Sequence, residues 1–361
     1  MSTASETIPA YFSSKLRFLS FVAATLVVLI HVPRPAFARL SLDWWCSDVF
    51  FDTFTRIAVP YFFFASALLL FRNYQPGREW YSRATCKRVR TLLVPYLVSN
   101  MVAFALYSAK ALASDIVHGR PASSFVTGLL RRAWLVTGLD ITRYPLVGSL
   151  WFVRNLFILV VLSPLVFLVV RRNRNIGFVA LVIAFVLWAS PLSNTVFFRI
   201  GFSLEGLFWF MAGAYCSRDL SRLGHPCKHA TPLCWVFLVA TLAFGIAGRA
   251  WFPKRFAFLG IAPGILAGLL SAFTFYDIIE RHIRLVPGNQ VLSTSSFLYL
   301  YQFVPLFIVS LLVGNLRLSF TRGATLTILL LWFMIAAVLV FSALAFKKSL
   351  PRTYSFVTGG R

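Results

Sequence analysis

Residues 20–35, SFVAATLVVLIHVPRP, decide the fold, because this run is apolar enough to begin a membrane span. Its only side chain that titrates near neutral pH is His31, near its far end. With a rise of about 1.5 Å per residue, a helix would place His31 roughly 20 Å beyond Arg17, past the middle of a bilayer. Ionisable groups at that depth usually face the inside of a bundle or a wet cavity. His31 is therefore either a hydrogen-bonded interfacial residue or a base or nucleophile inside a pore.

Apolar runs of similar length recur along the whole chain. The 361 residues are 59% hydrophobic and 13% charged, with a mean hydropathy of +0.78, whereas soluble domains are about 25% charged. We expect an all-α, polytopic membrane helix bundle with about ten transmembrane helices and both termini in the cytoplasm. The expected spans are residues 17–37, 50–71, 92–112, 148–170, 176–192, 202–216, 232–249, 258–276, 291–313 and 324–346.

The segments around these spans leave two alternatives open. Residues 1–16 are expected to form a cytoplasmic leader and residues 347–361 a polar cytoplasmic tail. The first span is expected to be an uncleaved anchor, although Ala-Phe-Ala at 36–38 would also suit a signal-peptide cleavage site. The longest connection, 113–147, is interpreted as a loop, with a re-entrant helix as the alternative.

The positions of the charged residues along the chain are explained by its orientation in the membrane. The net charge is +24, but the basic residues lie in short connections between apolar runs and are more numerous in the connections assigned to the cytoplasm, as the positive-inside rule requires. No nucleic-acid partner is expected. The five cysteines are scattered, so they predict no disulfide framework. The stretch HPCKHATPLC at 225–234 lacks the usual spacing of zinc ligands, and we expect a polar loop and no metal.

Five stretches place polar groups at membrane depth. The first contains His31, and the others are TRIAVPYFFFASALLLF at 55–71, KRVRTLLVPY at 87–96, SLWFVRNLFILVVLSPL at 149–165 and SSFLYLYQFVP at 295–305. Their content and order resemble the membrane-bound acyltransferase-3 family, over about residues 15 to 310. Members of that family move acetyl or other acyl groups onto glycans, lipids and antibiotics.

The resemblance implies a set of site residues and also shows departures. In the family, a basic residue precedes the first-span histidine by ten intervening positions; His31 matches, but Ser20 stands at the basic position and Arg17 lies one turn earlier. Gln302 stands where the family often has histidine. The implied catalytic residues are His31, Arg17, Arg56 and Arg154. Lys87, Arg88 and Arg90 are expected to bind the phosphates of acyl-CoA at the cytoplasmic mouth.

The resemblance implies a function, an acyltransferase-like domain over residues 17–346 and a place in the plasma (bacterial inner) membrane. The enzyme would move an acyl group, with acetyl favoured, from cytoplasmic acyl-CoA to a hydroxyl of a carbohydrate or lipid-linked glycan at the outer side. His31 would take the proton of that hydroxyl or accept the acyl group itself. The alternative is a non-enzymatic membrane carrier or exporter of a glycan intermediate, whose arginines bind an anionic lipid-linked sugar.

Overall fold

The regular structure is helical throughout the part of the chain that the computed structural model describes, which confirms the expected all-α class. That part comprises residues 9–33, 41–72, 74–75, 77–138, 140, 143–171, 173–220, 225–251, 257–282, 289–316 and 324–360. The proposed cleavage site at 36–38 lies outside it. The α-helices are α1 (Ala10–His31), α2 (Leu42–Trp44), α3 (Asp52–Thr55), α4 (Ala58–Phe71), α5 (Arg78–Arg88), α6 (Val94–Val117), α7 (Ala122–Thr137), α8 (Trp151–Val161), α9 (Ser163–Val166), α10 (Arg174–Trp188), α11 (Leu192–Ile200), α12 (Leu204–Cys216), α14 (Ala230–Ile246), α15 (Ala257–His282), α16 (Ser295–Tyr301), α17 (Phe303–Leu316), α18 (Ala324–Ser349) and α19 (Pro351–Thr358).

The expected ten membrane spans are not all identified among the residues that the structure describes. The described residues contain 6 helices long and apolar enough to cross a membrane, or up to 9 if each of three bent pairs is one span. The expected span at 202–216 is α12, a helix of 13 residues. At about 1.5 Å per residue it is roughly 20 Å long, too short to cross a ~30 Å hydrocarbon core by itself. The chain is thus a multi-pass membrane protein, and the orientation of its termini stays a prediction.

Prolines explain where the bent pairs break. The helices bend by 64° between residues 161 and 163, by 80° between 188 and 192, and by 52° at Gln302. Pro164 comes two residues after Leu162, Pro191 lies within the second break, and Pro305 lies three residues after Gln302. A proline has no amide hydrogen for the carbonyl four residues earlier and clashes with it, so each of these helices changes direction just before or at its proline.

The short helix α12 is held in the centre of the molecule by close packing against α4. Gly206 and Gly213 lie on the same face of α12, and a Cβ at either position would collide with α4, at the Phe63 ring or the Phe64 carbonyl oxygen. Small residues of this kind let two helices approach closely inside a membrane. Trp209 and Phe210 of α12 are almost completely buried, so α12 is part of the core although it is short.

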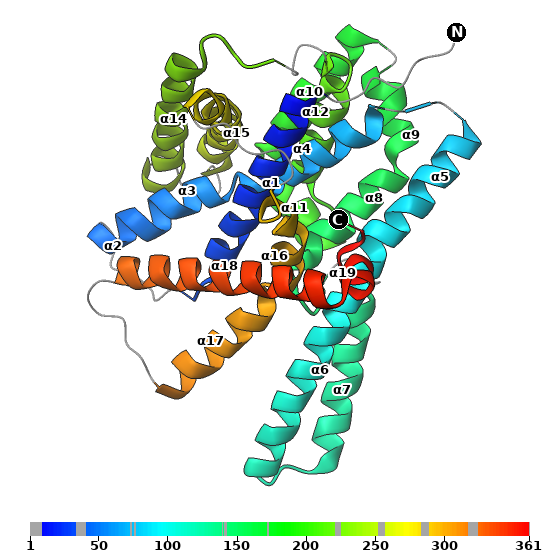
Figure 1. The fold of residues 1–361 in the computed structure, drawn as a ribbon, viewed down its shortest axis with the longest axis vertical. Helices are drawn as coiled ribbons and strands as arrows, with labels where there is room; N and C mark the ends of the chain where they lie inside the picture. The colour runs from blue at the N-terminus through cyan, green and yellow to red at the C-terminus, as the bar shows by residue number, and fades with distance from the viewer. Residues whose placement is uncertain are drawn as a thin grey trace.

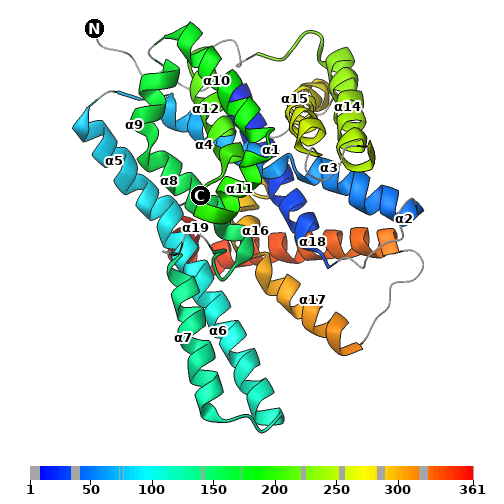
Figure 2. The same ribbon diagram turned by 180° about the vertical axis from the view of Figure 1, so that it is seen from behind.

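The expected loop at 113–147 is mostly helical, which corrects that interpretation. Helix α6 continues to Val117, and α7 returns beside it as an antiparallel hairpin that projects from the rest of the molecule (Figure 1). Gly119, in the turn between the two helices, has a φ of +60°, a conformation that glycine adopts without strain. In the view from behind, α14 and α15 form a second pair on the opposite side of α1, and α18 lies across the other long helices (Figure 2).

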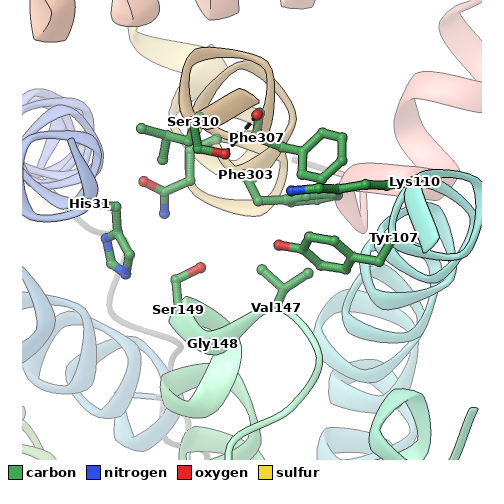
Figure 3. A pocket seen from close by; sticks show the side chains of 11 residues that line it. His31, Tyr107, Lys110, Val147, Gly148, Ser149, Phe303, Phe307 and Ser310 are labelled. Atoms are coloured by element: carbon green, nitrogen blue, oxygen red, sulfur yellow. Dashed lines mark hydrogen bonds between the residues drawn. The ribbon is translucent and has the colours of Figure 1, made fainter. Parts of the chain in front are cut away.

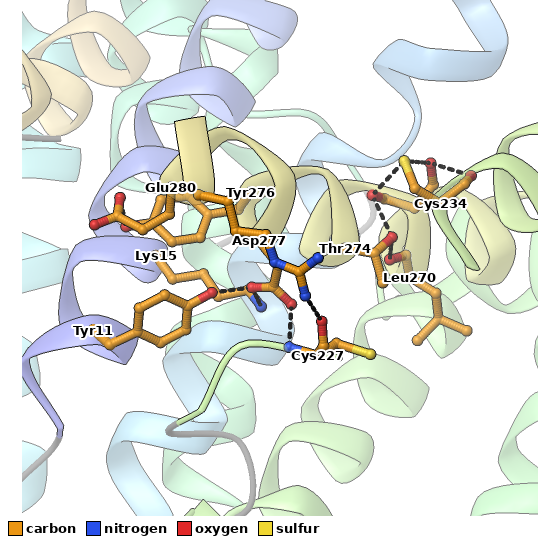
Figure 4. A network of polar contacts seen from close by, with 11 residues as sticks. Tyr11, Lys15, Cys227, Cys234, Leu270, Thr274, Tyr276, Asp277 and Glu280 are labelled. Atoms are coloured by element: carbon orange, nitrogen blue, oxygen red, sulfur yellow. Dashed lines mark hydrogen bonds and ion pairs between the residues drawn. The ribbon is translucent and has the colours of Figure 1, made fainter. Parts of the chain in front are cut away.

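A buried ion pair joins the beginning of α1 to the end of α15. Lys15 Nζ lies 2.6 Å from Asp277 Oδ1, and both side chains are almost fully buried. The Tyr11 hydroxyl donates to the same carboxylate, and the backbone N–H of Cys227 donates to its other oxygen at 3.1 Å (Figure 4). Removing either charge would leave its partner buried and uncompensated. Lys15 thus fixes the position of α1 against α15.

Candidate functional site

His31, the last residue of α1, lines a pocket of about 250 Å³ between α1, α6 and α17. Its imidazole is directed toward Ser149 and lies across the pocket from Tyr107 and Lys110 (Figure 3). His31 Nδ1 lies 2.9 Å from the carbonyl oxygen of Val27, one turn earlier. A carbonyl oxygen only accepts hydrogen bonds, so Nδ1 is the donor and the neutral ring has its basic lone pair on Nε2. The helix itself therefore fixes the tautomer in which Nε2 acts as a base.

The opposite wall of the pocket supplies a cation and aromatic surface. Lys110, in the second half of α6, has its ammonium 5.6 Å from the centroid of the Phe307 ring. The rings of Tyr107 and Phe307 meet edge to face with centroids 5.2 Å apart. The pocket therefore combines a base, a positive charge and apolar walls, as small-molecule sites usually do.

Gln302 belongs to the same pocket and is 1% exposed. Its Nε2 donates to the carbonyl oxygen of Tyr299 at 3.2 Å, whereas its Oε1 has no hydrogen-bond partner among the described residues. The bend ahead of Pro305 places the residue here, at the end of α16. A buried acceptor without a donor costs about 1–3 kcal/mol, so this oxygen is suited to a ligand that brings its own hydroxyl.

Residues 147–149 form a further wall of this pocket, and two buried side chains hold this wall in place. Asn100 of α6 accepts the backbone N–H of Val147 at 2.9 Å and donates to the carbonyl of Tyr96 at 2.9 Å. The Tyr299 hydroxyl donates to the carbonyl oxygen of Ser149. Both side chains are buried, so this segment is fixed relative to α6 and α16.

The arginines predicted as catalytic do not line this pocket. Arg17 is exposed on α1, roughly 20 Å from His31 along the helix. Arg56 pairs with Asp52 at 2.9 Å, a carboxylate that also pairs with Arg249. Glu205 is close enough to Arg56 for their charges to interact. Neither Arg17 nor Arg56 is among the residues that line the pocket.

Arg154 acts on the pocket indirectly. Its guanidinium donates to the carbonyl oxygens of Asp140 at 3.1 Å and Arg143 at 2.8 Å. These two residues lie in the connection that leads to the wall at 147–149, so Arg154 helps to position the wall.

A second pocket contains two of the three residues predicted to bind acyl-CoA. It has a volume of about 670 Å³, and its lining includes Lys87 and Arg90. Arg88 is half-buried and does not line it. The other side of the pocket is formed by α19, from which Arg352 and Ser355 contribute. Basic side chains around an open volume favour a ligand with phosphate groups.

Helices α6 and α16 connect the two pockets. Val94, at the beginning of α6, lines the second pocket and Tyr107 lines the first; they lie about 20 Å apart along the helix axis. On α16, the Tyr301 hydroxyl donates to the carbonyl oxygen of Val357 in α19 at 3.3 Å. The next residue, Gln302, lines the first pocket.

Two signals in the sequence would have found residues that the sequence analysis missed. Lys110 is a lone cation within an expected apolar span, which is a mark of function at membrane depth. Pro351 and Gly359 lie just inside and just past α19, the order typical of a helix start and stop.

Among the described residues, no three His, Cys, Asp or Glu side chains gather as metal ligands would.

Comparisons with known proteins cover most of the chain. A family model described as "Acyltransferase domain", that of the acyltransferase-3 family, matches residues 15–347. The chain is also 23% identical over 283 residues to the "Succinoglycan biosynthesis protein ExoH" of Rhizobium meliloti, in a match that covers 74% of this chain and 72% of that protein. No solved structure matches the chain significantly.

Proposed function

The chain belongs to the acyltransferase-3 family, and from this membership we propose that it transfers an acetyl group from cytoplasmic acetyl-CoA to a hydroxyl of a polysaccharide or its lipid-linked precursor. It is a membrane acyltransferase, which favours the enzyme over the carrier that the sequence left open. The printed name of the relative, a succinoglycan biosynthesis protein, supports a glycan as the acceptor. We place the enzyme in the bacterial inner membrane, with the acceptor on the outer side.

The observation that carries the proposal is the geometry of His31 in its pocket. With Nδ1 donating to Val27, Nε2 is the nitrogen that takes the proton of the acceptor hydroxyl. The hydroxyl oxygen then attacks the thioester carbonyl carbon, the carbon–sulfur bond breaks, and the departing CoA thiolate receives the proton. Lys110 supplies positive charge for the oxyanion that forms on the carbonyl oxygen.

The donor and acceptor are assigned to different pockets. The nucleotide end of CoA, with its phosphates, occupies the basic pocket of Lys87 and Arg90, and the pantetheine arm extends along α6 and α16 toward His31. The smaller pocket at His31 receives one sugar unit, whose neighbouring hydroxyl donates to Gln302 Oε1. Arg17 and Arg56, which line neither pocket, remain predictions from the family pattern alone.

The test is acetyl transfer from labelled acetyl-CoA by membranes that contain matched amounts of inserted wild type, His31→Ala or His118→Ala. His118 is a matched control because its Nδ1 also contacts the carbonyl oxygen one turn earlier, that of Ser114, at 2.7 Å. It lies in the projecting hairpin, outside both pockets. We expect His31→Ala to lose about 10²–10⁴-fold in rate, the usual contribution of a general base, and His118→Ala to keep full activity. Equal rates in all three would reject His31 as the base.

A further inference from the structure

The C-terminal helix α19 is docked firmly on the rest of the molecule, although the sequence analysis expected only a polar tail. Tyr354 is 2% exposed, and its ring stacks on Phe297 of α16 with centroids 5.9 Å apart. Burial raises the pKa of the Tyr354 phenol, so this side chain stays neutral where it is buried. Thr358, the last residue of the helix, is 1% exposed. The helix is therefore anchored through its middle and its C-terminal end.

The end of α19 packs directly against the backbone of Thr91, three residues before α6 begins. Gly359 has a φ of +72°, and a Cβ at this position would lie 2.6 Å from the carbonyl oxygen of Thr91. Any larger residue here would have to push the two segments apart. Thr91 itself lies between Arg90 and the start of α6 and lines the basic pocket. The close approach therefore sets the width of that pocket.

The docking brings a third cation to the pocket. Arg352, in the first turn of α19, lines it together with Lys87 and Arg90, and Ser355 adds a hydroxyl. Within the described part of the chain, none of these three cations forms an ion pair with a carboxylate. Like charges around one volume repel each other, so a bound polyanion would relieve a repulsion that the protein itself leaves uncompensated.

We propose that α19 forms one wall of the donor site and that Arg352, with Ser355, binds the phosphate groups of CoA. This inference rests on the proposed function, in which a CoA thioester is the donor. It goes beyond the family assignment, because the family match ends at residue 347 and α19 begins at Pro351. The affinity for the donor thus depends on a helix outside the matched domain.

The experiment measures binding of CoA, without turnover, to the full chain in nanodiscs of zwitterionic lipid. Arg352→Glu is compared with Lys348→Glu, which makes the same charge change four residues earlier, on an exposed side chain that does not line the pocket. We expect Arg352→Glu to weaken CoA binding by about tenfold or more, as loss of a charge-assisted contact does. Lys348→Glu should bind as the wild type does, and Arg352→Lys should keep part of the affinity. If Arg352→Glu does not fold, Arg352→Gln takes its place.

The possible failures are distinguishable. If the wild type does not bind CoA, the proposed donor is wrong and this inference falls with it. If the wild type binds CoA and Arg352→Glu binds it equally well, the inference is overturned while the donor stands. A parallel measurement uses nanodiscs with anionic lipid, since a lipid headgroup carries the same phosphate chemistry. Arg352-dependent binding of the anionic lipid, with CoA binding unchanged by the variant, would also overturn the inference.

Discussion

His31 and Gln302 bring two hydrogen-bond acceptors to one pocket, a basic nitrogen and an amide oxygen. A sugar ring presents adjacent hydroxyl groups, so one can be deprotonated at His31 while its neighbour donates to Gln302. His31 was predictable as the one side chain of an apolar span that titrates near neutral pH. The role of Gln302 was not predictable, because only the packed structure shows that its Oε1 has no hydrogen-bond donor among the described residues. The arginines stay predictions, since the sequence could not show that Arg56 pairs with Asp52.

The proposed role of Gln302 predicts the effect of Gln302→Met. This change removes the buried oxygen that has no donor together with the amide that bonds to Tyr299, so we expect the unfolding free energy to change by less than about 1 kcal/mol. The KM for the acceptor should rise several-fold, to about tenfold, while the KM for acetyl-CoA stays the same. Acceptor titrations at a fixed donor concentration measure this. The exposed Gln290 provides the control, Gln290→Met, and an unchanged acceptor KM in Gln302→Met would contradict the role.

At the scale of elements, buried asparagines join the ends of helices to the segments between them. Asn100 holds the pocket wall at 147–149. Asn155 of α8 makes equivalent bonds elsewhere, accepting the backbone N–H of Ser203 at 3.0 Å and donating to the carbonyl of Gly201 at 3.1 Å. Both asparagines are fully buried. The two sites have the same chemistry, but only one of them borders the pocket.

From these two asparagines we predict that Asn100→Leu and Asn155→Leu lower the unfolding free energy by similar amounts but differ in their effect on activity. Each leaves a buried backbone N–H without its acceptor, which costs about 1–3 kcal/mol. Thermal unfolding of the purified protein should show comparable losses in both variants. Only Asn100→Leu should lower kcat by roughly tenfold or more at a temperature where both are folded, because a displaced wall changes the approach to His31. Equal kcat values in the two variants would show that the wall does not position the reaction.

The elements themselves were only partly predictable. Hydropathy located nine of the ten expected spans as long helices or bent pairs, since a long apolar run has few other folds available in a membrane. It could not show that α12 is a short helix packed closely against α4. The role of Gly206 and Gly213 depends on their contact with α4, which the sequence of α12 does not show. It also missed α19, whose docking depends on Tyr354 and Phe297, residues far apart in the sequence.

At the scale of the whole molecule, the two pockets require the chain to have one orientation. Under the proposed function, Lys87 and Arg90 face the compartment that contains acetyl-CoA, so α5 and the basic pocket should lie on the cytoplasmic side. The excess of basic residues in the connections assigned to the cytoplasm favours the same orientation. The sequence therefore predicts an orientation, but testing it requires a reporter at the pocket.

Cys86 is such a reporter, because it lines the basic pocket and is exposed, whereas the other four cysteines are half-buried or buried. A membrane-impermeant maleimide should modify Cys86 in inside-out vesicles and not in intact spheroplasts. Added CoA should slow the modification several-fold by occupying the pocket. Peptide mass spectrometry identifies the labelled residue, and Cys86→Ser is the control for background. Labelling from the outer face would reverse the orientation, and an unchanged rate with CoA would place the donor elsewhere.

The projecting hairpin of α6 and α7 has a practical consequence for imaging. A 40.7 kDa chain that is largely surrounded by lipid offers little mass for the alignment of particles in electron cryomicroscopy. The turn at Gly119 is exposed, and α6 is continuous from this turn to the pocket at His31. A rigid helical fiducial fused through α6 and α7 would therefore report the orientation of the pocket at His31 itself, without altering any residue that lines it.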